Sequence, residues 1–233
     1  QDEIYAAMAT TTTGIIVVEP VYESTTDTYK VNISYPNGET ETIKTVIGEM
    51  TTLRAKEIAG QTFKCWKNGN TVLGYTQTLK VAPRSDLNLT AEYVTAGTQV
   101  DRLPVIALTE ISASQQNQKY AVSFTATRSV PDGYTVTGQG ILVSTASRYG
   151  ESDALDAMKL DSDGVKPADT LILKASNLDA TGVTVLNGTT KYADRTVYGR
   201  AYMILRDSAG KMVYVYSDTI LSGSYNSLTN GGN

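Results

Sequence analysis

The clearest pattern along the chain is the alternation of apolar and polar residues over 28–47. The apolar positions are Tyr29, Val31, Ile33 and Tyr35. A period of two is typical of a strand with one buried face. The tripeptide that follows, Pro36-Asn37-Gly38, favours a turn because Asn and Gly tolerate positive φ. The pattern therefore predicts a β-hairpin over 28–47.

Shorter patterns follow in the first hundred residues. Residues 48–60 are predicted to form a connector with one helical turn, closed by Gly60. The run TFKCW at 62–66 is typical of a short strand. A second strand is predicted over 86–94, where the apolar residues on one face are Leu87, Leu89, Ala91 and Tyr93.

The second half of the chain is also rich in strand patterns. Strands are predicted at 105–113, 119–128, 135–145, 170–175 and 183–186, and a hairpin at 196–217. VPDGY at 130–134 is predicted to be a turn, with Pro131 at its second position. Residues 151–161 have the spacing of a helix of about two turns, with Ala154, Leu155 and Met158 facing inward.

An internal similarity divides the chain. IIVVEPVYE at 15–23 resembles LNLTAEYV, and each is a strand-like run that ends near a Tyr. We therefore expect residues 1–27 to be the end of a preceding repeat or a linker strand. Residues 28–97 and 98–222 are predicted to be two modules, and the Gly/Ser/Asn-rich residues 223–233 a flexible tail.

Composition agrees with an all-β protein. The chain of 233 residues has 15 Tyr, 2 Phe and 1 Trp, and Tyr and Thr favour strands over helices. The net charge of -4 makes a nucleic-acid partner unlikely on electrostatic grounds. There is no apolar run long enough to insert into a membrane as a helix.

Two residue counts limit the chemistry. The absence of His excludes Ser-His-Asp and Cys-His catalysis and His-ligated metals within this chain. The single Cys65 excludes an intrachain disulfide. Chemistry based on carboxylates alone is not excluded.

The segment GQTFKCWKNGN at 60–70 contains the only Trp and the only Cys. It is either an aromatic or thiol site or the centre of a β module. In a regular strand, Phe63 and Cys65 face one side and Lys64 and Trp66 the other. We favour core packing, with Phe63, Trp66, Tyr93 and Phe124 as the predicted structural core.

Three further groups are candidate sites. Asp161, Asp163 and Asp169 surround Gly164 and offer hard oxygen ligands for calcium, but the EF-hand pattern is incomplete because position 170 is Thr. We expect no metal there and no cofactor. A strip of tyrosines in the last strands is the candidate glycan or protein contact, the alternative being packing within the sheet. Its members are Tyr198, Tyr202, Tyr214 and Tyr216.

Lys30 and Lys119, both early on strands, are candidates for an isopeptide bond with an Asn near a carboxylate.

The order of strand, turn, G-x-T-F-x-x-W and L-T-A-x-Y over residues 28–94 resembles the internalin-type B repeat, a β-grasp-like module of bacterial surface proteins. The residues that carry the resemblance are Gly60, Thr62, Phe63, Trp66, Leu89, Thr90, Ala91 and Tyr93. Cys65 stands where the family usually has Gly. The second module, YAVSFTATRSVPDGY onward, resembles an immunoglobulin-like module of bacterial surface proteins.

The predicted fold is thus mostly all-β: a β-grasp-like module followed by an immunoglobulin-like β-sandwich with one short helix. The resemblances imply an extracellular or cell-wall-associated bacterial protein. The leading hypothesis is a non-catalytic spacer, stalk or adhesion segment, monomeric as a fragment, with a host or microbial glycan or protein as partner. One alternative is a carbohydrate-binding accessory module of a secreted glycan-degrading enzyme. Another is a glycosidase, which needs two carboxylates about 5–10 Å apart.

Overall fold

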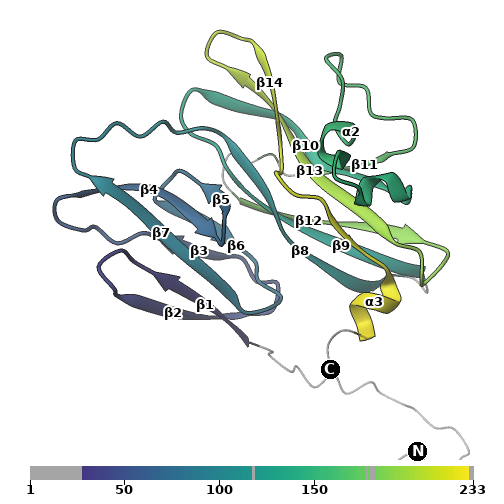
Figure 1. Ribbon diagram of the computed structural model, residues 1–233, viewed down its shortest axis with the longest axis horizontal. Coiled ribbons are helices and arrows are strands. Elements are labelled where there is room, and N and C mark those ends of the chain that lie inside the picture. The colour runs from purple at the N-terminus through teal and green to yellow at the C-terminus, as the bar shows by residue number, and fades with distance from the viewer. Residues whose placement is uncertain (1–27, 117–118, 177, 179–181, 231–233) are drawn as a thin grey trace, which may run out of the picture.

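The computed structural model describes residues 28–116, 119–176, 178 and 182–230. The chain is mostly β, as predicted, and its strands form two units that lie side by side (Figure 1). The predicted repeat end at 1–27 lies outside the described residues.

The first unit has a five-stranded mixed sheet in the order β2-β1-β7-β4-β5. Its strands are β1 (Thr28–Ser34), β2 (Thr40–Val46), β4 (Gln61–Asn68), β5 (Thr71–Gly74) and β7 (Leu87–Thr95). The first and last strands, β1 and β7, are parallel neighbours in the middle of this sheet. The hairpin predicted over 28–47 is present as β1 and β2, and Gly38 has a φ of 83° in its turn.

A two-stranded sheet packs over the mixed sheet. It consists of β3 (Thr51–Arg54) and β6 (Thr78–Val81). The helical turn predicted within 48–60 was wrong, because β3 occupies the start of that connector and is fixed by pairing with β6. The side chain of Leu53 on β3 is fully buried, so tertiary packing overrides the weak local preference. The sequence patterns did not predict β5 and β6.

The second unit is built from two packed sheets. One has the order β12-β9-β8, and the other β11-β10-β13-β14, with β15 also paired to β13. The first sheet comprises β8 (Val105–Gln116), β9 (Lys119–Ser129) and β12 (Gly182–Thr190). The second comprises β10 (Tyr134–Ser144), β11 (Leu171–Lys174), β13 (Val197–Asp207), β14 (Met212–Tyr216) and β15 (Leu221–Gly223). All the strands predicted in this half are present.

Phe124 is at the centre of the core between these two sheets, and it is fully buried as predicted. A Cβ atom added at Gly199 would lie 2.3 Å from its ring, so the facing strand needs glycine at this point.

The helices differ from the prediction. In place of two turns over 151–161, the chain forms a 3₁₀ turn, η1 (Ser147–Gly150), and a single turn, α2 (Ala154–Ala157). Ala154 and Met158 are buried as predicted, but Leu155 is 37% exposed, so its predicted inward position was wrong. The carbonyls of Leu155 and Met158 accept hydrogen bonds from Arg200, so they are not free to continue a helix.

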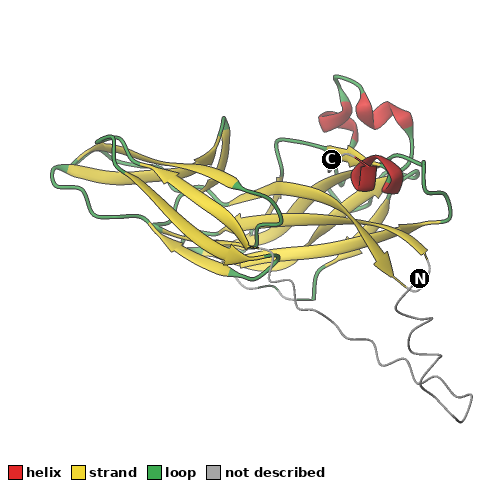
Figure 2. Cartoon of the chain, turned by 90° about the horizontal axis from the view of Figure 1, so that it is seen from below, coloured by secondary structure: helices red, strands yellow, loops and turns green. Residues whose placement is uncertain are grey.

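The predicted flexible tail is ordered through residue 230. It begins with the end of β15 and continues as α3 (Tyr225–Asn230), whose Leu228 packs against the sandwich core. Figure 2 shows the helical segments gathered at one end of the strands of the second unit. The chain therefore has two short α-helices among its described residues, α2 within the region where one was predicted and α3 near the C-terminus.

The two units meet along β5, β6, β8 and β9. Thr76 and Ser129 share a hydrogen bond of 3.0 Å between their hydroxyls, and Thr127 Oγ1 donates to the carbonyl of Lys80 at 2.6 Å. Ala107 on β8 is part of the core cluster of the first unit. The core of one unit thus continues into the other.

Candidate functional site

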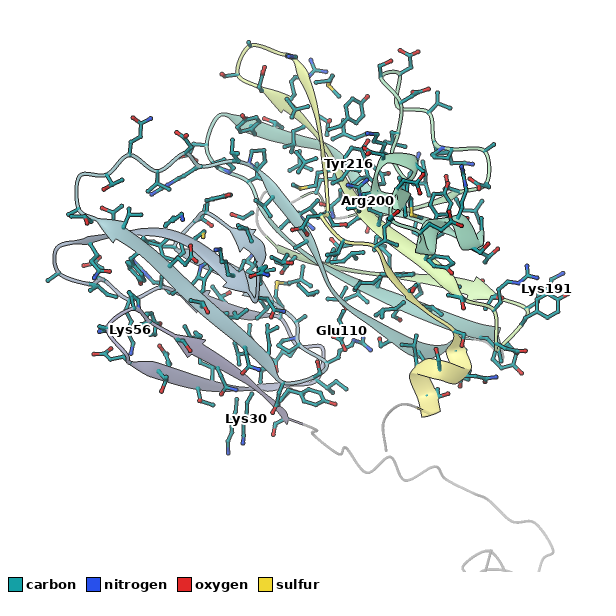
Figure 3. The ribbon with its side chains drawn as sticks, viewed as in Figure 1. Lys30, Lys56, Glu110, Lys191, Arg200 and Tyr216 are labelled. Carbon is teal, nitrogen blue, oxygen red and sulfur yellow. The ribbon has the colours of Figure 1, made fainter. Side chains whose placement is uncertain are left out.

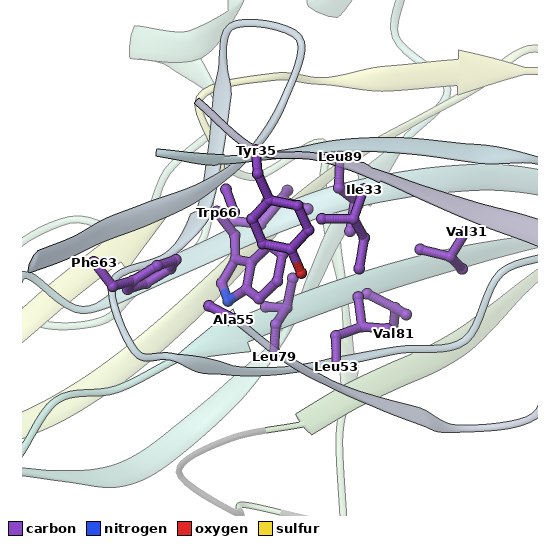
Figure 4. Close-up of a cluster of buried hydrophobic side chains, with 13 residues drawn as sticks. Val31, Ile33, Tyr35, Leu53, Ala55, Phe63, Trp66, Leu79, Val81 and Leu89 are labelled. Atoms are coloured by element: carbon purple, nitrogen blue, oxygen red, sulfur yellow. The ribbon is translucent and has the colours of Figure 1, made fainter. Parts of the chain in front are cut away.

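Trp66 is a core residue and its indole is fully buried. Its Nε1 donates to the carbonyl of Thr76 at 3.1 Å, which satisfies the polar atom of the ring. The ring centroid of Phe63 lies 5.5 Å from that of Trp66 (Figure 4), and it also lies 5.5 Å from that of Tyr93. Tyr93 is half-buried, and its hydroxyl donates to the carbonyl of Lys56. The aromatic residues of this segment therefore pack with each other rather than form an exposed platform.

The predicted alternation of this strand was wrong at one position. The register of β4 against β7 shifts between Phe63 and Cys65, so Lys64 is the extra residue of a β-bulge. The bulge places Phe63 and Trp66 on the same face, three positions apart. Cys65 then faces the opposite side of the sheet.

Cys65 is 1% exposed, and its Sγ lies 3.6 Å from Oε2 of Glu92. Burial and the Glu92 carboxylate raise the pKa of this thiol to about 11, against the smaller opposite effect of Lys64 and Lys67. Glu92 is itself paired with Lys67 at 2.7 Å and Lys64 at 3.3 Å, which lowers the pKa of its carboxyl. Cys65 is therefore protonated at neutral pH and shielded from solvent, unlike a reactive thiol.

The four candidate tyrosines do gather on one face. Tyr198 and Tyr202 on β13 and Tyr214 and Tyr216 on β14 all point to the outer side of their sheet, where η1 and α2 pack over them. Tyr202 is 3% exposed, and burial raises its pKa. These residues form a second small core under the helical segment.

Arg200 holds this segment in place, and no pattern around it in the sequence distinguishes it from other arginines. It is 8% exposed, its Nε donates to the carbonyl of Ser217 at 2.9 Å, and its guanidinium stacks 4.9 Å from the ring of Tyr216. Burial lowers the pKa of the Arg200 guanidinium. Figure 3 shows Arg200 and Tyr216 together beneath the helical segment.

The three candidate metal ligands do not converge. Oδ1 of Asp161 accepts hydrogen bonds from the backbone of Asp163 and Val165, which closes their own turn. Asp169 binds Arg148 through both carboxylate oxygens, at 2.7 and 2.8 Å. This pairing lowers the pKa of the Asp169 carboxyl. No group of three acidic, Cys or His residues that could hold a metal is found in the described part of the chain.

Among the described residues, the amine of the isopeptide candidate Lys30 forms no hydrogen bond or ion pair, although its backbone N–H donates to Oδ1 of Asp86 at 2.8 Å. Lys30 is exposed on β1 and extends from the outside of the first unit (Figure 3). The nearby Asn32 is hydrogen-bonded to Asn88 at 3.0 Å. The side chain of Lys119 lies outside the described residues.

A cavity lies on the first unit, beside the linker that leads to β8. It has a volume of about 560 Å³ and is lined by Lys56, Glu57, Ile58, Ala59, Gln61, Thr62, Phe63, Gln77, Tyr93 and Arg102. A neighbouring cavity of about 230 Å³ is lined by Thr76, Arg102, Val130, Pro131 and Asp132. Sequence reasoning missed both, because their polar residues come from loops and strand ends that are far apart in the chain.

No family model matches the sequence, and no curated protein matches it either. Within the described residues, no helix has both the length and the apolar character needed to cross a membrane.

Proposed function

We propose that this chain is a non-catalytic segment of a bacterial cell-surface or secreted multidomain protein, where it acts as a rigid spacer that presents other domains. The observation that carries the proposal is the packed junction. Units joined by a bare linker move relative to each other, whereas a packed interface restricts that motion. Here hydroxyl and backbone groups pair across the boundary, and Gly74 lies directly against Ser129.

The resemblance to the B repeat supports this proposal. Its aromatic motif residues Phe63 and Trp66 are buried, as a structural role requires. The parallel pairing of the first and last strands in the first unit also fits a β-grasp-like module.

The carboxyl chemistry supports a non-catalytic role. A glycosidase needs a general acid with a raised pKa. Among the described carboxyl groups, only Glu110 has a clearly raised pKa, because it is partly buried at the junction. The cavity that it lines is about 20 Å³, which is room for about one water molecule. A sugar ring does not fit beside this carboxyl.

The alternative function, a carbohydrate-binding module that uses the tyrosines of β13 and β14, has less support than the spacer. Stacking of a sugar ring on these residues requires aromatic faces open to solvent, whereas Trp66 and Tyr202 are buried.

The spacer proposal can be tested by measuring the distance between the units. Spin labels would be attached at Lys44→Cys and Met212→Cys, which are exposed positions on β2 and β14. The native Cys65 is buried and stays unlabelled. Pulsed electron paramagnetic resonance is expected to give one narrow distance distribution. A broad or bimodal distribution would show a hinge and contradict a rigid spacer. Antibody labelling of intact cells of the source bacterium would test the surface location.

A further inference from the structure

The two cavities share Arg102, which lies in the linker between the units; the larger cavity lies on the first unit and the smaller one between the two units. Thr76 in one is also adjacent in sequence to Gln77 in the other. Together they form a groove, here called the junction groove, that runs from the loop after β3 to the turn before β10. Its larger part, about 560 Å³, is within the range of about 300–1,000 Å³ that is common for ligand sites.

The polar side chains of the junction groove are available to a ligand. Within the described residues, the side chains of Gln61, Gln77 and Arg102 form no hydrogen bond or ion pair. The Thr62 hydroxyl is likewise unpaired there. An amide or a hydroxyl both donates and accepts hydrogen bonds. This matches a ligand whose own groups do both, as the hydroxyls of a sugar do.

The charges in the groove nearly balance. Arg102 is opposed by Glu57 and Asp132, which also line it. Lys56 is already shared between Glu39 at 3.6 Å and Glu41 at 3.7 Å. The groove therefore has little net field to select an anionic or a cationic ligand, and a neutral ligand fits it best.

The groove also has an aromatic wall. Tyr93 is fixed in orientation because its hydroxyl donates to the carbonyl of Lys56 and its ring meets Phe63 edge to face. This half-buried ring gives the groove a rigid apolar surface for van der Waals contact with the C–H groups of a sugar. A docked peptide would instead use apolar pockets and an open strand edge. The lining of the groove, by contrast, is mostly amide, hydroxyl and charged groups.

From these observations we propose that the junction groove binds a neutral oligosaccharide. This inference rests on the proposed role at the bacterial surface and adds a partner class to it. It places the contact at Gln61, Gln77, Tyr93 and Arg102, not at the tyrosines of β13 and β14.

The test is a titration of the isotopically labelled full chain followed by NMR. The probes are cellohexaose, maltohexaose, mannohexaose and chitohexaose, each to about 5 mM, enough to saturate a site with a Kd of about 1 mM. At least one probe is expected to shift the side-chain amide signals of Gln61 and Gln77 and the Nε signal of Arg102. Absence of shifts with all four probes would overturn the proposal, as would shifts confined to Tyr198 and Tyr202.

Exposed substitutions separate binding from folding. Arg102→Ala and Gln77→Ala are each expected to weaken binding about fivefold to tenfold, because each removes hydrogen bonds to the ligand. The matched control is Arg206→Ala, since Arg206 is exposed on β13 and away from the groove. An equal loss in the control would contradict the assignment. Shifts in the groove with a tryptic digest of casein, but with none of the sugars, would identify a peptide site and overturn the proposal.

The distance measurement between the units does not depend on a sugar. A narrow distance distribution without binding of any hexasaccharide would therefore refute only the proposal that the junction groove binds a sugar. A broad distance distribution would refute the proposal of a rigid spacer.

Discussion

Replacement of Gly74 by Ala is expected to push the two units apart. Gly74 is the last residue of β5, and a Cβ atom there would lie 2.6 Å from Cβ of Ser129 and 3.0 Å from its Oγ. Carbon atoms in contact normally lie about 3.5–4.0 Å apart. The strands must therefore separate by about 1 Å, which also lengthens the 3.0 Å hydrogen bond between Thr76 and Ser129 beyond bonding distance.

The expected magnitude follows from three contributions. Overpacking costs about 1–3 kcal/mol, and the lost hydrogen bond about 1 kcal/mol. Ala in a strand gains about 0.5–1 kcal/mol relative to Gly. The net loss in the free energy of unfolding is therefore about 2 kcal/mol.

The assay is urea unfolding followed by the fluorescence of Trp66, the only tryptophan, which is buried in the first unit beside this junction. Gly188→Ala is the control, because a Cβ atom there meets only Leu173 at an ordinary 3.7 Å. Ser129→Gly removes the opposing Cβ, so the double variant is expected to recover at least 1 kcal/mol relative to the sum of the single changes. If Gly74→Ala changes stability by less than about 0.5 kcal/mol and leaves the label distances unchanged, the units do not pack as described.

Three further predictions concern single side chains. The Cys65 thiol, with its pKa near 11, should resist a thiol reagent such as DTNB at pH 8 in the folded chain and react within minutes in urea; fast reaction without urea would mean that Cys65 is accessible. The raised pKa of Glu110 means that the folded state holds its proton more tightly than the unfolded state, so this residue makes stability fall as pH rises from the unfolded pKa through the folded one. Urea unfolding of Glu110→Gln between pH 4 and pH 7 should therefore show a smaller fall than the parent, and an unchanged pH profile would refute this. Arg200→Ala should lower the free energy of unfolding by about 2–4 kcal/mol and speed proteolysis within 146–170, because three buried carbonyls lose their donor. The exposed Arg206→Ala should change stability by less than about 0.5 kcal/mol, and equal effects of the two would contradict a role for Arg200 in holding the segment.

The alternation of apolar residues predicted the long strands well because each has one or both faces buried. The hairpin at 28–47 and the strand at 86–94 follow this rule directly. The strands β5 and β6 are only four residues each, too short for a period of two to stand out. β5 forms a tight hairpin with β4, whereas β6 pairs with the more distant β3, for example Leu79 with Leu53.

In the helical region the local pattern predicted more regular structure than forms. The spacing of Ala154, Leu155 and Met158 is that of a helix, yet one turn forms. The guanidinium of Arg200, more than forty positions later, donates hydrogen bonds to the carbonyls of Leu155 and Met158. A local pattern contains no information about such a distant donor.

The junction groove could not have been predicted for a related reason. Gln61, Gln77 and Arg102 belong to three separate segments, and each alone resembles an ordinary solvated side chain. The fold of the first unit brings Gln61 and Gln77 together, and the linker that contains Arg102 passes beside them. Residues that meet only in the folded chain leave no spacing motif in the sequence.

The bulge at Lys64 connects the fold to the question of the single cysteine. Without the extra residue, strict alternation would put Phe63 on the side of Cys65 and separate it from Trp66. The bulge brings Phe63 and Trp66 to one face, where they are buried together. It leaves Cys65 on the opposite face beside Glu92, whose carboxylate disfavours a thiolate. The same backbone irregularity therefore completes the aromatic core and makes the thiol unreactive, which is why Trp66 and Cys65 are structural residues.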